Sequence, residues 1–248
     1  MFKRTLITVF IGILGVVVVS CAATVNPTAP EKAAANSILR GGMLYDNWFA
    51  TLGVAKPSTT HAMWPASNTK KKGDVTWRCK SCHGWDYMGA DGAYASGSYA
   101  SGITGIRSFD GGDPAAVVAL LRGEVHGYTQ AMIPDAELDN IVAFVTQGQF
   151  SLDKYIDRAS KKSNGNAVRG KSFYNSICAN CHGADGKTMN FKTADDPEFL
   201  GTLANGNPWE AINKIRHGQP DSQMPALGNF PLKDLNDILA YAQTLPAE

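Results

Sequence analysis

Two short stretches, Cys79-Lys-Ser-Cys82-His83 and Cys178-Ala-Asn-Cys181-His182, decide how this chain of 248 residues is organised. They share the pattern C-x-x-C-H. In a helical turn, side chains three positions apart lie on the same face, so the two thiols of each stretch point the same way. The histidine follows one step later along the same turn. Each stretch therefore places two sulfurs and one imidazole where all three can reach one flat group.

This spacing is the attachment signature of a c-type haem. The two thiols capture the two vinyl groups along one edge of the porphyrin, and the histidine becomes the proximal ligand of the iron. Two copies of the pattern predict two covalently bound haem c groups. The predicted attachment residues are Cys79, Cys82, Cys178 and Cys181, and the predicted proximal iron ligands are His83 and His182.

Other sites also use pairs of cysteines. A C-x-x-C pair alone is found in redox dithiols, in disulfides and as half of a zinc site. Here each pair is followed directly by His, then by Gly84 or Gly183 and a turn rich in Gly and Asp. One zinc ion held by the four thiolates would leave both histidines unexplained. The repeated context therefore favours two haems over zinc or a disulfide.

The first 20 residues are typical of a signal peptide, because Lys3 and Arg4 precede a mostly apolar run, Leu6–Val19. That run is shorter than the roughly 20 apolar residues that a membrane span needs. An ordinary signal peptide cut near Ala22-Ala23, or an uncleaved anchor, would also fit the pattern. All of these interpretations place the chain outside the cytoplasm, where bacterial c-type haems are attached.

The end of the apolar run, Val18-Val19-Ser20-Cys21, resembles a bacterial lipoprotein processing site. The resemblance implies that Cys21 is lipidated and becomes the mature N-terminus. It also fits the cysteine count, since the other four cysteines are assigned to haem. Small, polar and proline-containing residues follow, so 21–36 is predicted to be a lipid-anchored flexible tether. We expect the periplasmic side of a bacterial membrane and leave inner or outer membrane open.

An internal repeat divides the rest of the chain. Arg40-Gly-Gly-Met-Leu-Tyr45 matches Arg169-Gly-Lys-Ser-Phe-Tyr174, and each segment precedes one haem motif. After each motif, Asp113-Pro114 or Asn207-Pro208 supplies an N-cap and a first-turn proline. Each half then closes with an amphipathic helical pattern. These matches predict two helical domains of one type, 37–150 and 166–248, joined by a linker at 151–165.

Each half resembles a class I cytochrome c, with a first helix, C-x-x-C-H, middle helices, a loop bearing Met and a C-terminal helix across the first. The resemblance implies an all-α fold of two tandem class I cytochrome c-like domains. The second half fits the family closely. The first differs by an insertion, residues 46–78, between its first helix and its haem motif. Covering the haem edge and forming a docking surface are both possible roles for this insertion.

The distal iron ligands follow from the same resemblance. Met224 precedes Pro225 in the loop before the last helix, where the family places its ligand. In the first half, Met132 aligns with Met224, since a His-Gly pair precedes the Met in both loops. His126 of that His-Gly pair remains an alternative to Met132. A sulfur opposite the proximal histidine raises the reduction potential relative to a second histidine.

Two irons with both axial positions filled favour an electron carrier rather than an enzyme. We expect a dihaem cytochrome c that passes single electrons between redox proteins, as a shuttle or as the electron-transfer subunit of a complex. Removing Lys3 and Arg4 with the signal peptide leaves 21 basic and 22 acidic residues, and nothing indicates nucleic acid. The alternative is a dihaem oxidoreductase, resembling thiosulfate dehydrogenases or peroxidases, in which one haem is the active site.

The lipid anchor gives the first testable prediction. Cys21→Ser should release the protein from membranes while both haems stay attached, because only the acylation site is lost. Membrane and soluble fractions are compared by haem absorbance. A Cys21→Ser protein that stays with the membranes would instead indicate an uncleaved apolar anchor at Leu6–Val19.

Overall fold

The computed structural model describes residues 28–247, so the predicted signal peptide and Cys21 lie outside the described residues. Within that range the chain is helical, and β-pairing is limited to two isolated bridges, Gly89–Thr104 and Ile156–Ser163. The all-α prediction is confirmed for these residues. Over the same range, no helix combines the length and the apolar character that a membrane crossing requires.

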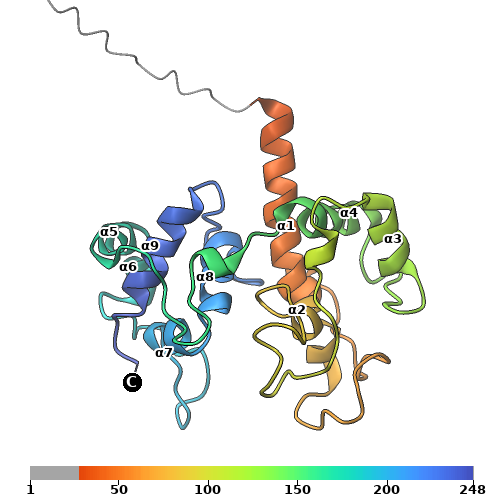
Figure 1. Cartoon of the computed structure of the whole chain (residues 1–248), viewed down its shortest axis with the longest axis horizontal. Coiled ribbons are helices and arrows are strands. Elements are labelled where there is room, and N and C mark those ends of the chain that lie inside the picture. The colour runs from red at the N-terminus through yellow and green to blue at the C-terminus, as the bar shows by residue number, and fades with distance from the viewer. Residues whose placement is uncertain (1–27, 248) are drawn as a thin grey trace, which may run out of the picture.

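The helices fall into two groups that lie side by side in Figure 1, α1–α4 on the right and α5–α9 on the left. The α-helices are α1 (Ala29–Leu52), α2 (Cys79–His83), α3 (Pro114–Arg122), α4 (Asp135–Ala143), α5 (Ala167–Phe173), α6 (Ala179–His182), α7 (Leu200–Gly206), α8 (Pro208–His217) and α9 (Leu232–Ala242). Shorter 3-10 turns are η1 (Gly73–Trp77), η2 (Arg107–Phe109) and η4 (Leu152–Lys154), and π-helical turns are η3 (Phe144–Gly148) and η5 (Tyr174–Cys178).

The first and last helices of each half cross at a glycine. A Cβ atom added to Gly41 in α1 would lie 1.9 Å from the Asn140 carbonyl oxygen of α4. A Cβ atom added to Gly170 in α5 would lie 1.8 Å from the Asp237 carbonyl oxygen of α9. Both distances are far inside van der Waals contact, so only glycine lets these helices approach so closely. The matched glycines of the sequence repeat therefore occupy matched crossings.

The arginine before each glycine ties the same two helices together. Arg40 forms a two-pronged ion pair with Glu137, at 3.0 and 2.9 Å. Arg169 pairs with both Asp234 and Asp237 of α9. Paired hydrogen bonds between a guanidinium group and a carboxylate fix orientation as well as distance. The repeated Arg-Gly pair thus sets both the spacing and the rotation of each helix crossing.

Helix α1 begins earlier than the sequence predicted. Residues 29–36 were expected to be a flexible tether, but they form the first two turns of α1. Pro30 lies in the first turn, and the Glu31 side chain accepts a hydrogen bond from the Thr28 amide at 2.6 Å. Three consecutive alanines, which favour helix more than any other residue, follow. These start signals outweigh the polar composition that suggested a tether.

The two halves pack against each other through α8. The Asp46 carboxylate is only 3% exposed, and it pairs with Arg78 of the first half and Lys214 of α8. Burial alone would raise the pKa of Asp46, but the two cations outweigh burial and hold the pKa below its ordinary value. His217, at the end of the same helix, packs its ring against the Phe144 ring. The interface is therefore buried and charge-paired.

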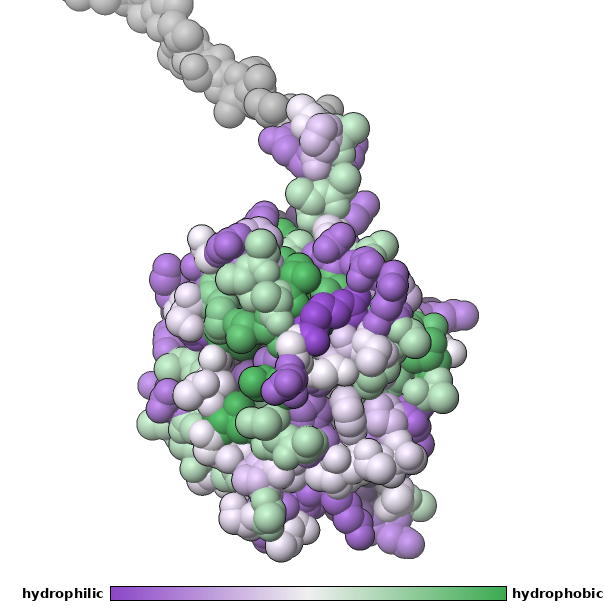
Figure 2. Space-filling view, turned by 90° about the vertical axis from the view of Figure 1, so that its right-hand side faces the viewer, coloured by the Kyte–Doolittle hydropathy of each residue, from purple (hydrophilic) through white to green (hydrophobic). Residues whose placement is uncertain are grey.

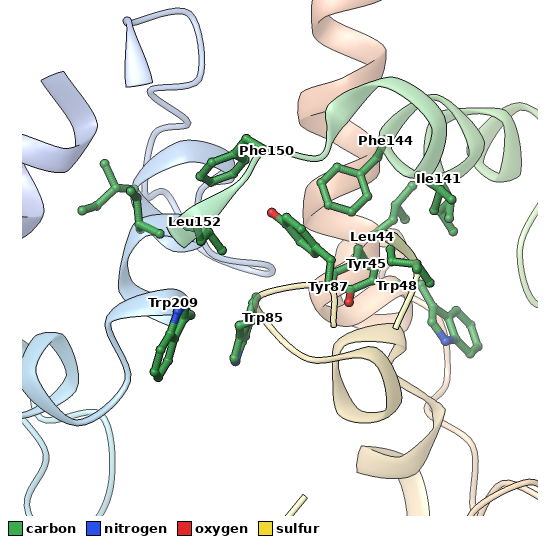
Figure 3. Packing of buried hydrophobic residues seen from close by; sticks show 14 of the residues in the cluster. Leu44, Tyr45, Trp48, Trp85, Tyr87, Ile141, Phe144, Phe150, Leu152 and Trp209 are labelled. Atoms are coloured by element: carbon green, nitrogen blue, oxygen red, sulfur yellow. The ribbon is translucent and has the colours of Figure 1, made fainter. Parts of the chain in front are cut away.

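A second contact between the halves centres on Asn213 of α8. Its side chain donates to the Trp85 carbonyl at 2.8 Å and accepts from the Tyr87 hydroxyl at 2.6 Å. Figure 3 shows Trp85 from the first half and Trp209 from α8 facing each other beside this contact. Trp85 and Tyr87 closely follow the first C-x-x-C-H motif. Helix α8 of the second half is therefore bound directly to the segment that follows the first motif in the sequence.

The segment predicted as a linker, 151–165, also contributes to this contact. Leu152 and Ile156 are buried, and Arg158 forms an ion pair with the buried Asp86 at 2.7 Å. The division into domains 37–150 and 166–248 remains a prediction, but the connection between them is packed rather than free. Figure 2 looks onto the side that carries α3 and α4, where hydrophobic surface lies in patches below α1, separated by hydrophilic side chains.

The helix crossings predict the sign of three glycine substitutions. Gly41→Ala and Gly170→Ala should each lower the free energy of unfolding by about 1–3 kcal/mol, because the new methyl group overlaps a carbonyl of the facing helix. Gly206→Ala is the matched control. It has open space around its Cβ position, and it should leave stability unchanged or raise it by about 0.5 kcal/mol. Chemical denaturation measures the free energy of unfolding of all three variants. Equal effects of the three substitutions would contradict a close approach of the helices at Gly41 and Gly170.

Candidate haem sites

The two C-x-x-C-H motifs have the same local conformation. The first forms the short helix α2, and the second spans the end of η5 and all of α6. Each helical turn stops at a glycine with positive φ, Gly84 at φ 79° and ψ 161° and Gly183 at φ 82° and ψ 161°. This region of backbone space is open mainly to glycine. After both motifs, the backbone therefore leaves the helix in the same tight turn at a glycine.

A buried tyrosine holds each of these glycine turns in place. The Tyr45 hydroxyl of α1 donates to the Gly84 carbonyl oxygen at 2.6 Å. The Tyr174 hydroxyl of η5 donates to the Gly183 carbonyl oxygen at the same distance, 2.6 Å. These are the tyrosines that close the repeated Arg-Gly segments in the sequence. The helix crossing and the motif are thus connected through one side chain in each half.

The first motif opens onto a cavity of about 470 Å³. Cys79, Cys82 and His83 lie on its wall. This volume is within the range of about 300–1,000 Å³ that is usual for small-molecule and cofactor sites. The rest of the wall is largely apolar, and its apolar members include Ile103, Ile106, Phe109, Val117, Leu120, Leu121, Val125, Ile141 and Val145. Two thiols and an imidazole on the wall of an apolar cavity fit a covalently attached haem.

The predicted proximal histidine of this site, His83, is held in one tautomer. The His83 Nδ1 atom lies 2.7 Å from the Thr104 carbonyl oxygen. A carbonyl can only accept, so Nδ1 carries the proton and Nε2 keeps its lone pair. Burial lowers the pKa of His83 to about 4, which keeps the ring neutral near pH 7. A neutral imidazole oriented through Nδ1 is the form that binds a metal.

The cysteines do not have the properties of a redox dithiol. The four cysteines of the two motifs are free of disulfide bonds. Burial raises the pKa of Cys79 to about 11, of Cys82 to about 12 and of Cys178 to about 11. Reactive thiols in redox proteins have a lowered pKa instead. The surroundings of these sulfurs fit thioether attachment to an apolar ring better than thiol chemistry.

Helix α1 continues to Leu52, so the first seven residues of the predicted insertion 46–78 belong to the first helix, and the part after α1 covers this cavity. His61, Met63 and Thr76 of the insertion are on its wall. The Trp77 ring packs on the His61 ring with centroids 4.4 Å apart, and the Trp77 carbonyl accepts a hydrogen bond from Tyr128 at 2.9 Å. Of the two roles that the sequence left open, the contacts support covering the cavity. The sequence offered no signal for Tyr128 or Thr104, whose roles depend on distant partners.

The predicted distal ligand Met132 is not among the residues that line the cavity. Its side chain is partly buried and packs against the hydrophobic core. His126, the alternative from the sequence, is on the wall. Met63 is there too, but it is 51% exposed. The structure therefore separates the two candidates of the first half by position.

The second motif lies in a more open setting. Cys178 packs against the core, Cys181 is exposed and His182 is half-buried, with its ring 6.0 Å from the Phe191 ring. The His182 Nδ1 atom is buried and has no hydrogen-bond partner within residues 28–247. Met224 is half-buried in the loop between α8 and α9, and its carbonyl lies close to Gly218 at the end of α8. The motif and its predicted distal loop thus belong to the same half.

A comparison with protein families agrees with this geometry in the second half. Residues 165–241 match the family described as cytochrome C oxidase, cbb3-type, subunit III. The match identifies a cytochrome c domain there, and such a domain implies covalently bound haem c and electron transfer. No curated protein matches the chain.

The tyrosine contacts give a prediction for both sites. Tyr45→Phe should lower the free energy of unfolding by about 1–3 kcal/mol, because it leaves the Gly84 carbonyl without its buried partner. Tyr174→Phe should act in the same direction at Gly183. Tyr241→Phe is the control, since its ring packs on Tyr174 but its hydroxyl makes no hydrogen bond within the described residues. Equal denaturation midpoints for the three variants would contradict the stabilising role of the Tyr45 and Tyr174 hydroxyls.

Proposed function

We propose that this chain is a dihaem c-type cytochrome that transfers single electrons between redox proteins outside the cytoplasm. It would act as a freely diffusing or tethered shuttle, or as the electron-transfer subunit of a complex. The observation that carries the proposal is the pair of C-x-x-C-H turns, each fixed by the same tyrosine to glycine hydrogen bond. The cytochrome c match to residues 165–241 supports the second haem directly.

In this proposal Cys79 and Cys82 attach one haem and Cys178 and Cys181 attach the other. His83 and His182 are the proximal ligands, and Met224 is the distal ligand of the second iron. When bound, the haem irons supply one-electron oxidation and reduction. The apolar wall around the first motif excludes water, and the fixed tautomer of His83 keeps Nε2 directed to the ligand. These residues hold the cofactor in a constant environment.

The interface between the halves supports transfer within one molecule. Asp46 with its two cations, and Asn213 with Trp85 and Tyr87, fix α8 to the first half. Both contacts are buried, and moving α8 away would break the Asp46–Lys214 ion pair and both hydrogen bonds of Asn213 together, so these contacts favour one fixed arrangement of the halves. A fixed separation between two redox centres gives a constant rate of exchange between them. We therefore treat the two sites as one unit.

The N-terminal part of the proposal concerns location. Lipidation at Cys21 would hold the protein on the periplasmic side of a bacterial membrane. Figure 1 shows α1 extending beyond both groups of helices at its N-terminal end. Residues 29–36 of this helix are mostly exposed and span about 12 Å. A helical spacer would hold the haem sites away from the lipid surface, where redox proteins reach them.

Counting haems tests the proposal. The purified protein should carry two haem groups per chain, measured by haem absorbance against protein mass. Cys178→Ser with Cys181→Ser should retain one haem, and Cys79→Ser with Cys82→Ser should retain the other. One haem or none in the unmodified protein would refute the dihaem proposal.

The distal ligand of the second haem has its own test. Met224→Ala should keep both haems attached, lower the potential of one of them and open that iron to carbon monoxide, because a soft sulfur ligand is lost. Met189→Ala is the matched control, since Met189 follows the same motif and its side chain is 44% exposed. An unchanged potential in Met224→Ala would remove Met224 from the scheme.

A further inference from the structure

The geometry points to His126, rather than a methionine, as the distal ligand of the first haem, so that this iron lies between two imidazoles. The inference rests on the proposed function, because it concerns how the first of the two haems is ligated. It also makes the two haems chemically different, one with two histidines and one with histidine and methionine.

The two rings are spaced for one metal ion. The centroids of the His83 and His126 rings lie 6.1 Å apart, and the ring planes are inclined by 36°. A metal to imidazole bond of about 2.0 Å and a ring radius of about 1.1 Å put two imidazoles on opposite sides of one metal roughly 6 Å apart, centroid to centroid. Both side chains lie on the wall of the same cavity. The separation of the two ring centroids matches that of two imidazoles bound to one shared iron.

Each ring also presents the correct nitrogen. The His126 Nδ1 atom lies 3.0 Å from the Leu120 carbonyl oxygen, as His83 Nδ1 lies 2.7 Å from that of Thr104. Since a carbonyl oxygen only accepts, the proton of each neutral ring is on Nδ1 and the lone pair is on Nε2. A histidine that donates its other N–H to a backbone carbonyl is the usual arrangement of a metal ligand. Both histidines have it.

The loop that carries His126 is built to hold it in place. Its amide donates to the Gly123 carbonyl at 3.2 Å, and the Gly127 amide donates to the same oxygen at 2.8 Å. Gly127 has a φ of 65°, a backbone conformation that glycine adopts without strain. From the insertion, the His61 Nε2 atom lies 3.1 Å from the His126 carbonyl oxygen. The loop is therefore fixed from its own chain and from the covering segment.

The other candidates on this side are occupied, exposed or absent from the lining, and Met63, which is on the wall, is 51% exposed. His61 uses both ring nitrogens, because Nδ1 accepts from the Met63 amide at 3.1 Å and Nε2 donates to the His126 carbonyl. His61 is thus a positioning residue for His126. Met132 is partly buried against the core and is not among the residues that line the cavity. The His-Gly pair that marks the loop in both halves supplies the ligand itself in the first half.

The difference in axial ligands would give the two haems different reduction potentials, and so a direction of electron transfer. Two histidines give a lower potential than histidine with methionine. With Met224 on the second iron, the first haem would be the stronger reductant. An electron would then pass downhill from the first site to the second. The donor would dock near the first half, and the acceptor near the second.

The test uses the full-length protein with both haems attached. Haem content is measured first, and fewer than two haems would refute the proposed function before ligation is considered. His126→Ala should bind one carbon monoxide per chain when reduced, because its iron loses a ligand. Met132→Leu is the matched control and should bind none, with both midpoint potentials unchanged. Carbon monoxide binding by Met132→Leu, or none by His126→Ala, would overturn the inference.

Two further measurements keep the inference testable if His126→Ala accumulates poorly. The far-red sulfur to iron band of the unmodified ferric protein, scaled to total haem, should have the intensity of one methionine-ligated haem. In Met132→Leu that intensity should be unchanged. In His126→Met it should rise toward that of two haems, and one midpoint potential should increase. A band for two haems in the unmodified protein, or its loss in Met132→Leu, would show that Met132 is the ligand.

Discussion

The structure depends on the close crossing of the first and last helix in each half, at Gly41 and at Gly170. With the helix backbones in contact, the residue one position earlier forms ion pairs across the crossing. The residue four positions later, Tyr45 or Tyr174, is then directed at the end of the haem motif. One helical segment thus carries a spacing constraint, an orienting ion pair and a hydrogen bond to the site. A larger residue at the glycine would displace all three, because they share one rigid helix.

The two sites share this arrangement of helix crossing, ion pair and tyrosine, but the residues around each motif differ. In the first half, the insertion 46–78 and the loop around His126 complete an apolar cavity with His61, His83 and His126 on its wall. In the second half, Cys181 is exposed and the predicted ligand Met224 is on a separate loop. Axial ligands, burial and hydrogen bonding are the main means by which a protein tunes a haem. The same attachment geometry therefore lies in two different surroundings, which would give two bound haems different potentials.

The contact between the halves has a second consequence. Asn213 and Lys214 of α8 bind the segments around the first motif, through Trp85 and Asp46. A buried charge without its partner is costly, so each half stabilises the other's docked position. Although the repeat in the sequence describes two similar units, the structure makes them one assembly. The packed connection at 151–165 supports the same conclusion, because its Leu152 and Ile156 side chains are buried.

The sequence by itself determined the features that depend on local spacing. The C-x-x-C-H pattern, the helical class and the Arg-Gly to Tyr repeat follow from side chains a few positions apart, and α-helical geometry fixes those relations. The composition of residues 29–36 predicts a tether, but the helix start signals Pro30 and Glu31 place the start of α1 there. The position of His126 on the cavity wall, and the absence of Met132 from the lining, came from the folded structure alone. A distal ligand comes from a loop far along the chain from the haem motif. Its position therefore depends on long-range packing, and aligning the loops of the two halves by sequence gives no information about that packing.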